Sequence, residues 1–140
     1  MIVTFDFDGT LWRWGFNPED GTFSRSCGPD PIALGTVKYW RKKGASIHIV
    51  TSRGSSTRNE VDEFTDQHGD LFDGVHFTEG CWKSRTLAEL GSDLHFDDDH
   101  EELGQLEPRT RGILWTTGHL DENDRVCDPE NQRFNFSIWE

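Results

Sequence analysis

The feature that most constrains the fold is an alternation of short apolar segments with longer helical patterns. Five segments rich in β-branched and aromatic residues indicate buried strands, and helical periodicity fills most of the intervals between them. Strands that alternate with helices form a mostly parallel sheet with helices on both faces. The sequence therefore predicts an α/β chain with a Rossmann-like, mostly parallel five-stranded sheet. The strands are expected at 2–7, 46–50, 74–78, 93–97 and 112–116, and the helices at 31–44, 56–69, 83–91 and 99–106.

The length of 140 residues suits a single domain, residues 1–140, with one core. Hydrophobic residues make up only 33% of the chain, but six Trp and ten Phe provide large buried area per residue. Residues 12–30 are aromatic and rich in turn formers, so we expect a flap or hairpin after the first strand. Residues 121–140 form a C-terminal extension to which the pattern assigns no place.

Charge and cysteine content narrow the class of protein. The formal net charge of −12 disfavours a general nucleic-acid surface and suits either cation binding or an ordinary acidic protein. No apolar run is long enough for a transmembrane helix, and no basic region precedes the first apolar stretch as in a signal peptide. Cys27, Cys81 and Cys127 are odd in number and lack CxxC spacing, which favours a reduced, cytoplasmic chain without structural zinc.

The first predicted strand ends in "DFDGT", with Asp6 and Asp8 one residue apart. Side chains two residues apart on a strand share a face, so the two carboxylates are expected on one side. Like charges this close raise each other's pKa unless a cation or strong hydrogen-bond donors lie between them. The pair is therefore a candidate site, the alternative being a simple cap or turn.

The other strand ends carry polar residues as well, and ligands of open parallel sheets bind beyond the carboxyl ends of the strands. Each of these residues taken alone would more often be solvated, but the topology brings them to one edge. They are Thr51, Ser52 and Arg53 after the second strand, Lys83 at the start of the helix after the third, and Asp97, Asp98 and Asp99 after the fourth. The strand histidines His48, His76 and His95 are expected in the core or on a sheet face.

These residues resemble the haloacid dehalogenase (HAD) superfamily over roughly residues 1–118. The family has a DxDGT motif, a hydrophobic strand that ends in Thr or Ser, a lysine, and a strand that ends in paired acids, in this order. The resemblance implies that Asp6 is a nucleophile that becomes an aspartyl phosphate, and that Asp8 is the general acid and base. It implies that Thr51 donates a hydrogen bond to a phosphoryl oxygen and that Lys83 steadies the nucleophile and the phosphate.

The resemblance also implies Mg²⁺ as cofactor, a hard cation that prefers oxygen ligands. The expected ligands are Asp6, the backbone carbonyl of Asp8, Asp97 and Asp98, with Asp99 as a rival for the last position or as a helix N-cap. Arg53 is expected to bind a second phosphate. Further substrate contacts are expected from Gly9, Thr10, Trp12 and Ser52.

Many members of this family carry a cap domain. The intervals from Asp8 to Thr51 and from Thr51 to Lys83 are too short for a separately folded domain, so the chain resembles the capless type. An open site is expected to accept a bulky substrate or to be closed by oligomerisation. The sequence itself does not indicate an oligomeric state.

The hydroxyl-x-Arg pattern and the aromatic fifth strand are similar to the 3′-phosphatase domain of phage-type polynucleotide kinase. The first expectation is therefore a phosphomonoesterase for a nucleotide or a nucleic-acid 3′-phosphate end, although the chain lacks an evident basic surface. A phosphoprotein or small phosphometabolite phosphatase is the alternative, and a catalytically silent module that binds a cation or a partner is the alternative of another class. The flap aromatics Trp12, Trp14, Phe16 and Phe23 either stack on a base or pack the flap.

Overall fold

The structure is a computed structural model, and it describes residues 1–13, 15–17, 22–24 and 28–115. The predicted α/β architecture is confirmed, and all five strands of the main sheet are parallel, in the order β5-β4-β1-β6-β7. Each predicted strand is present, with ends that differ by one or two residues, as element boundaries commonly do. The strands are β1 (Ile2–Phe5), β4 (Ser46–Thr51), β5 (Gly74–Phe77), β6 (Leu94–Asp97) and β7 (Arg111–Leu114).

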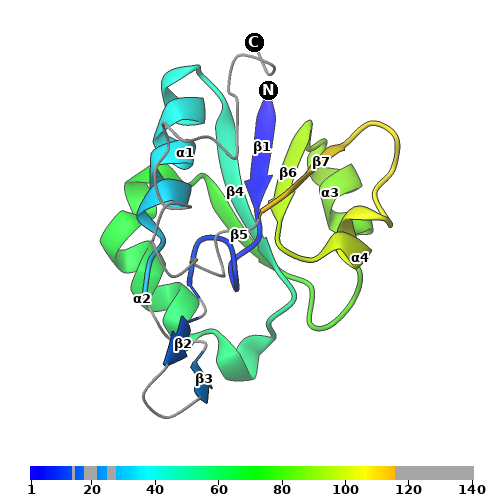
Figure 1. The fold of residues 1–140 in the computed structure, drawn as a ribbon. Coiled ribbons are helices and arrows are strands. Elements are labelled where there is room, and N and C mark those ends of the chain that lie inside the picture. Colours follow the sequence, from blue (N-terminus) through cyan, green and yellow to red (C-terminus); the bar gives the residue numbers. More distant parts are fainter. Residues whose placement is uncertain (14, 18–21, 25–27, 116–140) are drawn as a thin grey trace.

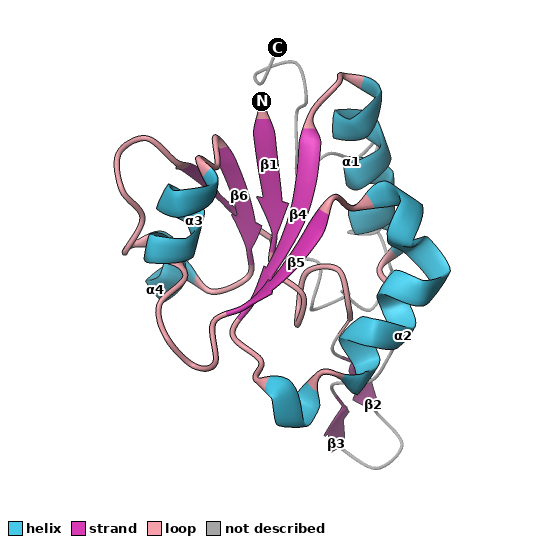
Figure 2. Ribbon diagram, turned by 180° about the vertical axis from the view of Figure 1, so that it is seen from behind, coloured by secondary structure: helices cyan, strands magenta, loops and turns pink. Residues whose placement is uncertain are grey.

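Four α-helices in the described part of the chain cover the two faces of this sheet. They are α1 (Pro31–Lys42), α2 (Asn59–His68), α3 (Ser84–Leu90) and α4 (His100–Leu103). The helices α1 and α2 lie on one side of the sheet, and α3 and α4 lie on the other (Figures 1 and 2). Right-handed crossovers require this division, because the chain first runs from β1 to β5 and then returns past β1 to β7. The direction of winding therefore changes at β1, where open α/β sheets bind their ligands.

The helix ends follow local chemistry more closely than the sequence pattern suggested. Asp30 caps α1, since its carboxylate accepts from the backbone N–H groups of Ile32 (2.9 Å) and Ala33 (3.3 Å). The helix expected at 56–69 begins later, because a short 3₁₀ turn, η1 (Ser55–Thr57), precedes α2. The helix expected at 99–106 ends at Leu103, where Gly104 follows, and glycine disfavours helix continuation.

The two faces of the sheet differ in chemistry. Register places Val3, Phe5, Ile47 and Ile49 on a common face, and they share a buried cluster with Val37 of α1. The other face of the central strands carries buried polar groups instead. They are Thr4, His95 and Asp97, all fully buried, on the side where α3 and α4 lie. The hydrophobic core therefore lies on one face of the sheet. The buried polar groups on the other face lead to the site at the ends of β1 and β6.

The segment after the first strand contains the expected hairpin. Strands β2 (Gly15–Asn17) and β3 (Thr22–Ser24) pair antiparallel beyond the carboxyl ends of the main strands (Figure 1). Trp14, the side chains of Phe16 and Phe23, and the C-terminal extension lie outside what the structure describes, as do Cys27 and Cys127. Among the described helices, none combines the length and the apolar character that crossing a bilayer requires.

Candidate active site

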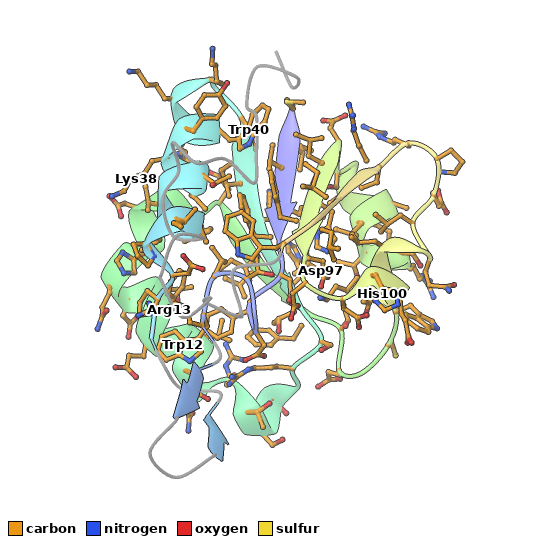
Figure 3. The ribbon with its side chains drawn as sticks, in the orientation of Figure 1. Trp12, Arg13, Lys38, Trp40, Asp97 and His100 are labelled. Carbon is orange, nitrogen blue, oxygen red and sulfur yellow. The ribbon has the colours of Figure 1, made fainter. Side chains whose placement is uncertain are left out.

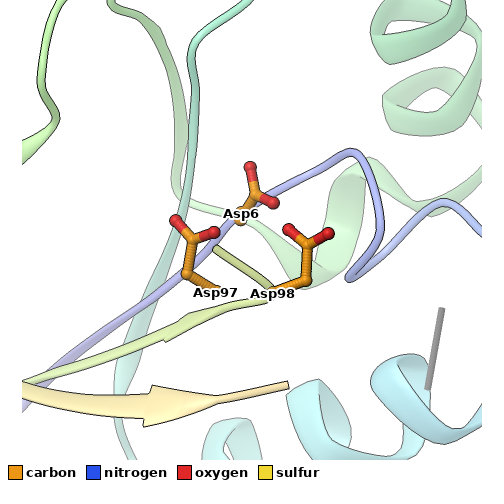
Figure 4. Close-up of side chains that lie close together, drawn as sticks. All are labelled: Asp6, Asp97 and Asp98. Carbon is orange, nitrogen blue, oxygen red and sulfur yellow. The ribbon is translucent and has the colours of Figure 1, made fainter. Parts of the chain in front are cut away.

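Three carboxylates meet where β1 and β6 end side by side. Asp6 follows β1 directly, and its backbone N–H still donates to the Phe96 carbonyl of β6 at 2.8 Å. Asp97 is the last residue of β6, and Asp98 follows it. The carboxylates of Asp6, Asp97 and Asp98 turn toward one another, with one oxygen from each lying within 4.8 Å of the others (Figure 4).

Lys83 lies between two of these acids. Its Nζ donates to Asp6 Oδ1 and to Asp97 Oδ2, each at 2.7 Å, and only 2% of the residue is exposed. Lys83 occupies the N-cap position of α3, and its backbone N–H donates to Glu102 Oε2 at 3.1 Å. The start of α3 and Glu102 of α4 thus fix the backbone of Lys83, and its ammonium group contacts the acids at the ends of β1 and β6.

Burial and mutual repulsion set the charge state of the cluster. Burial raises the pKa of Asp6 well above its usual value, and the charges of Asp97 and Asp98 add to this, against the opposing effect of Lys83. Burial also raises the pKa of Asp98 to about 6.

The other two ionisable groups keep their charge. Burial alone would raise the pKa of Asp97, but the hydrogen bond from His95 and the charge of Lys83 hold it below its usual range. Burial alone would lower the pKa of Lys83, but the carboxylates of Asp6 and Asp97 raise it. Ionisation of all three carboxylates would give the cluster more negative charge than one ammonium group neutralises, and this repulsion adds to burial in raising the pKa of Asp6.

A buried hydrogen-bond chain orients Asp97 from behind. Ser92 Oγ lies 2.8 Å from Thr4 Oγ1, which lies 2.8 Å from His95 Nδ1, and His95 Nε2 lies 2.9 Å from Asp97 Oδ2. Burial lowers the pKa of His95, which favours a neutral ring. A neutral ring that donates from Nε2 to the carboxylate can accept at Nδ1 from the Thr4 hydroxyl.

The donor set fits Mg²⁺. Three carboxylates close together offer the hard oxygen ligands that this cation prefers. Asp98 rather than Asp99 belongs to the cluster, because Asp99 caps α4 by accepting from the Glu101 backbone N–H at 2.9 Å. Gly9, at a φ of +80°, leaves room for this arrangement, since a Cβ on it would collide with Asp98 Oδ2.

Asp8 is held by Arg53 through two short hydrogen bonds. Nε of Arg53 donates to Asp8 Oδ2 and Nη2 donates to Oδ1, each at 2.7 Å. The remaining nitrogen, Nη1, donates to the Thr57 carbonyl at 2.7 Å and to Glu60 Oε1 at 3.0 Å. The side-chain hydrogen bond to Asp8 outweighs burial and raises the pKa of Arg53 above its usual value. Each nitrogen of this guanidinium therefore has a protein partner, whereas the sequence suggested a second phosphate.

Asp6 and Asp8 do open into the same space, as expected, although β1 ends at Phe5 and the turn after it, rather than strand alternation, places Asp8. A cavity of about 300 Å³ contains both carboxylates. Its lining residues are Asp6, Asp8, Ser52, Lys83, Asp97, Asp98, Asp99, His100 and Glu102.

The other predicted residues lie near this cavity but not all face it. Thr51 is fully buried, and its Oγ1 accepts from the Arg53 backbone N–H at 3.2 Å, while its neighbour Ser52 lines the cavity. Thr10 Oγ1 lies 3.4 Å from Asp6 Oδ2. Trp12 is 8% exposed and stacks on Phe7 at 5.5 Å between ring centroids, so it packs the core (Figure 3).

Sequence reasoning missed three residues of the site. His95 had a local signal, because His-x-Asp on one strand puts both side chains on one face. Glu60 and Glu102 had none, since each reaches the site from a helix whose position depends on tertiary packing.

Comparison of the chain with protein-family models gives no match, and comparison with curated proteins also gives none. The geometry of the described residues is therefore the observation from which a function is inferred.

Proposed function

We propose that this chain is a Mg²⁺-dependent phosphomonoester hydrolase of the capless HAD type that acts through an aspartyl phosphate. The observation that carries the proposal is the buried Lys83 ammonium between Asp6 and Asp97, with Asp98 beside them at the switch point of a parallel sheet. A carboxylate, a fixed cation and a set of oxygen ligands for a metal ion are the parts that phosphoryl transfer to a protein side chain needs.

In the first step an oxygen of Asp6 attacks phosphorus, a bond forms between them, and the bond from phosphorus to the leaving oxygen breaks. Lys83 holds the other oxygen, Oδ1, and so orients the nucleophile. Asp8 must first take up a proton from solvent, which it then gives to the leaving oxygen, so the product is an alcohol. To do so, Asp8 must turn one oxygen from Arg53 toward the cavity that both acids line.

In the second step water attacks the aspartyl phosphate. Asp8 takes a proton from this water, the bond between phosphorus and Asp6 breaks, and inorganic phosphate leaves. Ser52 lines the cavity and can donate a hydrogen bond to a phosphoryl oxygen. Thr51, which was expected in this role, is fully buried and is not part of the cavity lining.

Asp6, Asp97, Asp98 and the backbone carbonyl of Asp8 would hold Mg²⁺, which supplies charge neutralisation at the phosphoryl oxygens when bound. His95 orients Asp97 for this task, as groups behind a ligating carboxylate commonly do.

The test is hydrolysis of p-nitrophenyl phosphate by the full chain, with Mg²⁺ and with EDTA. We expect turnover that depends on Mg²⁺ and that disappears in Asp6→Asn, while Asp66→Asn, the same change at a remote acid in α2, keeps it. Binding of Mg²⁺ without turnover of any phosphate ester would instead favour the silent cation-binding module.

A further inference from the structure

A second, larger cavity adjoins the acidic one. Its volume is about 770 Å³, and it shares Asp8 and Ser52 with the acidic cavity. Its lining residues are Asp8, Ser52, Arg53, Gly54, Ser56, Thr57, Asn59, Glu60, Glu79 and Gly80. The two spaces meet at the residue proposed to protonate the leaving oxygen, so the larger one lies on the leaving-group side of the bond that breaks.

The sizes of the two cavities suit this division. A space of about 300 Å³ with carboxylates and a lysine accommodates a phosphoryl group and a cation. The adjoining 770 Å³ falls in the range of sites for small organic ligands, roughly 300–1,000 Å³. A small leaving group fits this volume.

The lining of the larger cavity is rich in hydrogen-bond acceptors. Glu60 and Asp8 already take up the cationic group of Arg53. Glu79 is exposed at the rim of the cavity and has no hydrogen-bond or ion-pair partner among the described residues. Its side chain lies across from Gly54, whose added Cβ would be 3.7 Å from Glu79 Cγ. A carboxylate without a partner binds O–H and N–H donors and repels a second anion.

The described lining offers little for the recognition of a nucleic-acid end. It contains no aromatic side chain and no lysine, and its arginine, Arg53, is already paired with Asp8 and Glu60. Trp12, for which base stacking was one of two expectations, is buried against Phe7. Base stacking and phosphate-backbone binding require such groups.

We propose that this cavity holds the leaving group of the substrate, and that the leaving group is rich in hydroxyl or amino groups and carries no second anionic group. Sugar, polyol and amino-alcohol phosphates share this chemistry. The inference rests on the proposed function and, among its substrate classes, favours the small phosphometabolite.

The test compares three hexose-derived 6-phosphates that differ in charge away from the phosphate. They are glucosamine 6-phosphate, glucose 6-phosphate and 6-phosphogluconate. We expect kcat/KM of the wild-type protein for glucosamine 6-phosphate and glucose 6-phosphate to be at least about tenfold higher than for 6-phosphogluconate. A difference of this size corresponds to one hydrogen bond to a charged group, or to one avoided repulsion between like charges. A 3′-phosphorylated oligonucleotide, as fourth substrate, should be the poorer substrate as well.

The variants Glu79→Gln and Glu79→Lys report whether Glu79 sets this preference. In each variant the ratio of kcat/KM for glucosamine 6-phosphate to kcat/KM for 6-phosphogluconate should be lower than in the wild-type protein. For Glu79→Lys it should fall by about tenfold or more. Glu107→Lys, the same charge change at an exposed site far from the cavity, should keep the wild-type ratio. A ratio unchanged in both Glu79 variants, or a wild-type preference for the oligonucleotide, overturns the inference.

The failures of the two proposals differ in this experiment. If p-nitrophenyl phosphate is hydrolysed but the Glu79 variants keep the wild-type ratio, the leaving-group inference alone is wrong. If no ester is hydrolysed with Mg²⁺ present, the proposed function fails and the inference falls with it.

Discussion

Replacing Lys83 with methionine isolates the charge that holds the acidic cluster together. Methionine keeps the length and apolar stem of lysine but removes the ammonium group that contacts Asp6 and Asp97. Both carboxylates are then buried without the cation, and Asp98 adds a third negative charge. We expect Lys83→Met to be strongly destabilised at pH 7 in EDTA.

The size of this loss follows from the burial of the pair. Breaking a buried ion pair by removing one partner costs about 3–5 kcal/mol, because the remaining charge is left without compensation. For a domain of this size, 1 kcal/mol shifts the melting temperature by about 3 °C, so a loss of about 10 °C or more is expected. The exposed-lysine variant Lys38→Met on α1 should change the melting temperature by only a small fraction of this (Figure 3).

The pH dependence separates lost charge from lost packing. In the wild-type protein Lys83 and His95 lower the pKa of Asp97, which stabilises the fold above the unfolded pKa and is lost as pH falls. The variant lacks the Lys83 contribution, so its deficit should be largest near pH 7 and should shrink toward pH 4.5, where carboxylates bind protons. Mg²⁺ should also narrow the deficit, since a cation replaces the ammonium charge.

Urea unfolding of both variants at pH 7 and pH 4.5, with EDTA or Mg²⁺, measures these differences. Equal free energies of unfolding for wild type and Lys83→Met at pH 7 would refute the reasoning. A deficit that stays constant across pH and Mg²⁺ would point to packing alone and refute it as well.

Three further changes probe the same cluster. Asp6→Asn should reduce hydrolysis of p-nitrophenyl phosphate below about 1% of wild type while the circular dichroism spectrum stays native, because the amide lacks the attacking charge; higher residual activity would remove Asp6 from the nucleophile role. Asp98→Asn should raise the melting temperature in EDTA above pH 6 and abolish the increase that Mg²⁺ gives. Burial raises the pKa of Asp98 to about 6, so the wild-type fold loses stability as pH rises from about 4 to 6, whereas the amide of asparagine does not ionise and avoids this loss. Gly9→Ala should weaken the Mg²⁺ shift more than Gly28→Ala does, because both have positive φ but only a Cβ at Gly9 meets Asp98; equal effects in a thermal-shift assay would assign the loss to backbone strain alone.

The sequence was sufficient for the parts of the molecule that depend on local pattern. Alternating segments predicted the parallel sheet, and the sheet then brought the ends of β1 and β6 together, so the approach of Asp6 to Asp97 followed from topology. Asp99 as helix cap was among the alternatives because aspartate commonly caps helices, and the structure shows that hydrogen bond.

The side-chain contacts that the sequence pattern did not predict depend on tertiary packing. Arg53 was expected to bind phosphate, but the loop after β4 turns its guanidinium to Asp8, and α2 brings Glu60 to its other side. Trp12 was expected either to stack on a base or to pack the flap, and the turn after β1 folds its ring onto Phe7. No local periodicity encodes either contact, because each is set by where a helix or turn packs.

The charge balance of the resting site makes a last prediction about the order of binding. Among the described residues at the site, the cations that face the carboxylates of Asp6, Asp8, Asp97 and Asp98 are Lys83 and Arg53. Both cations already have carboxylate partners. A phosphate dianion that enters this site meets net negative charge and should be repelled unless a divalent cation is bound first. Inorganic phosphate should therefore raise the melting temperature only when Mg²⁺ is present, and sulfate at equal ionic strength controls for general salt effects. A phosphate shift of the same size in EDTA would mean that Arg53 or Lys83 leaves its carboxylates to bind the anion, and the order of binding argued from these ion pairs would be wrong.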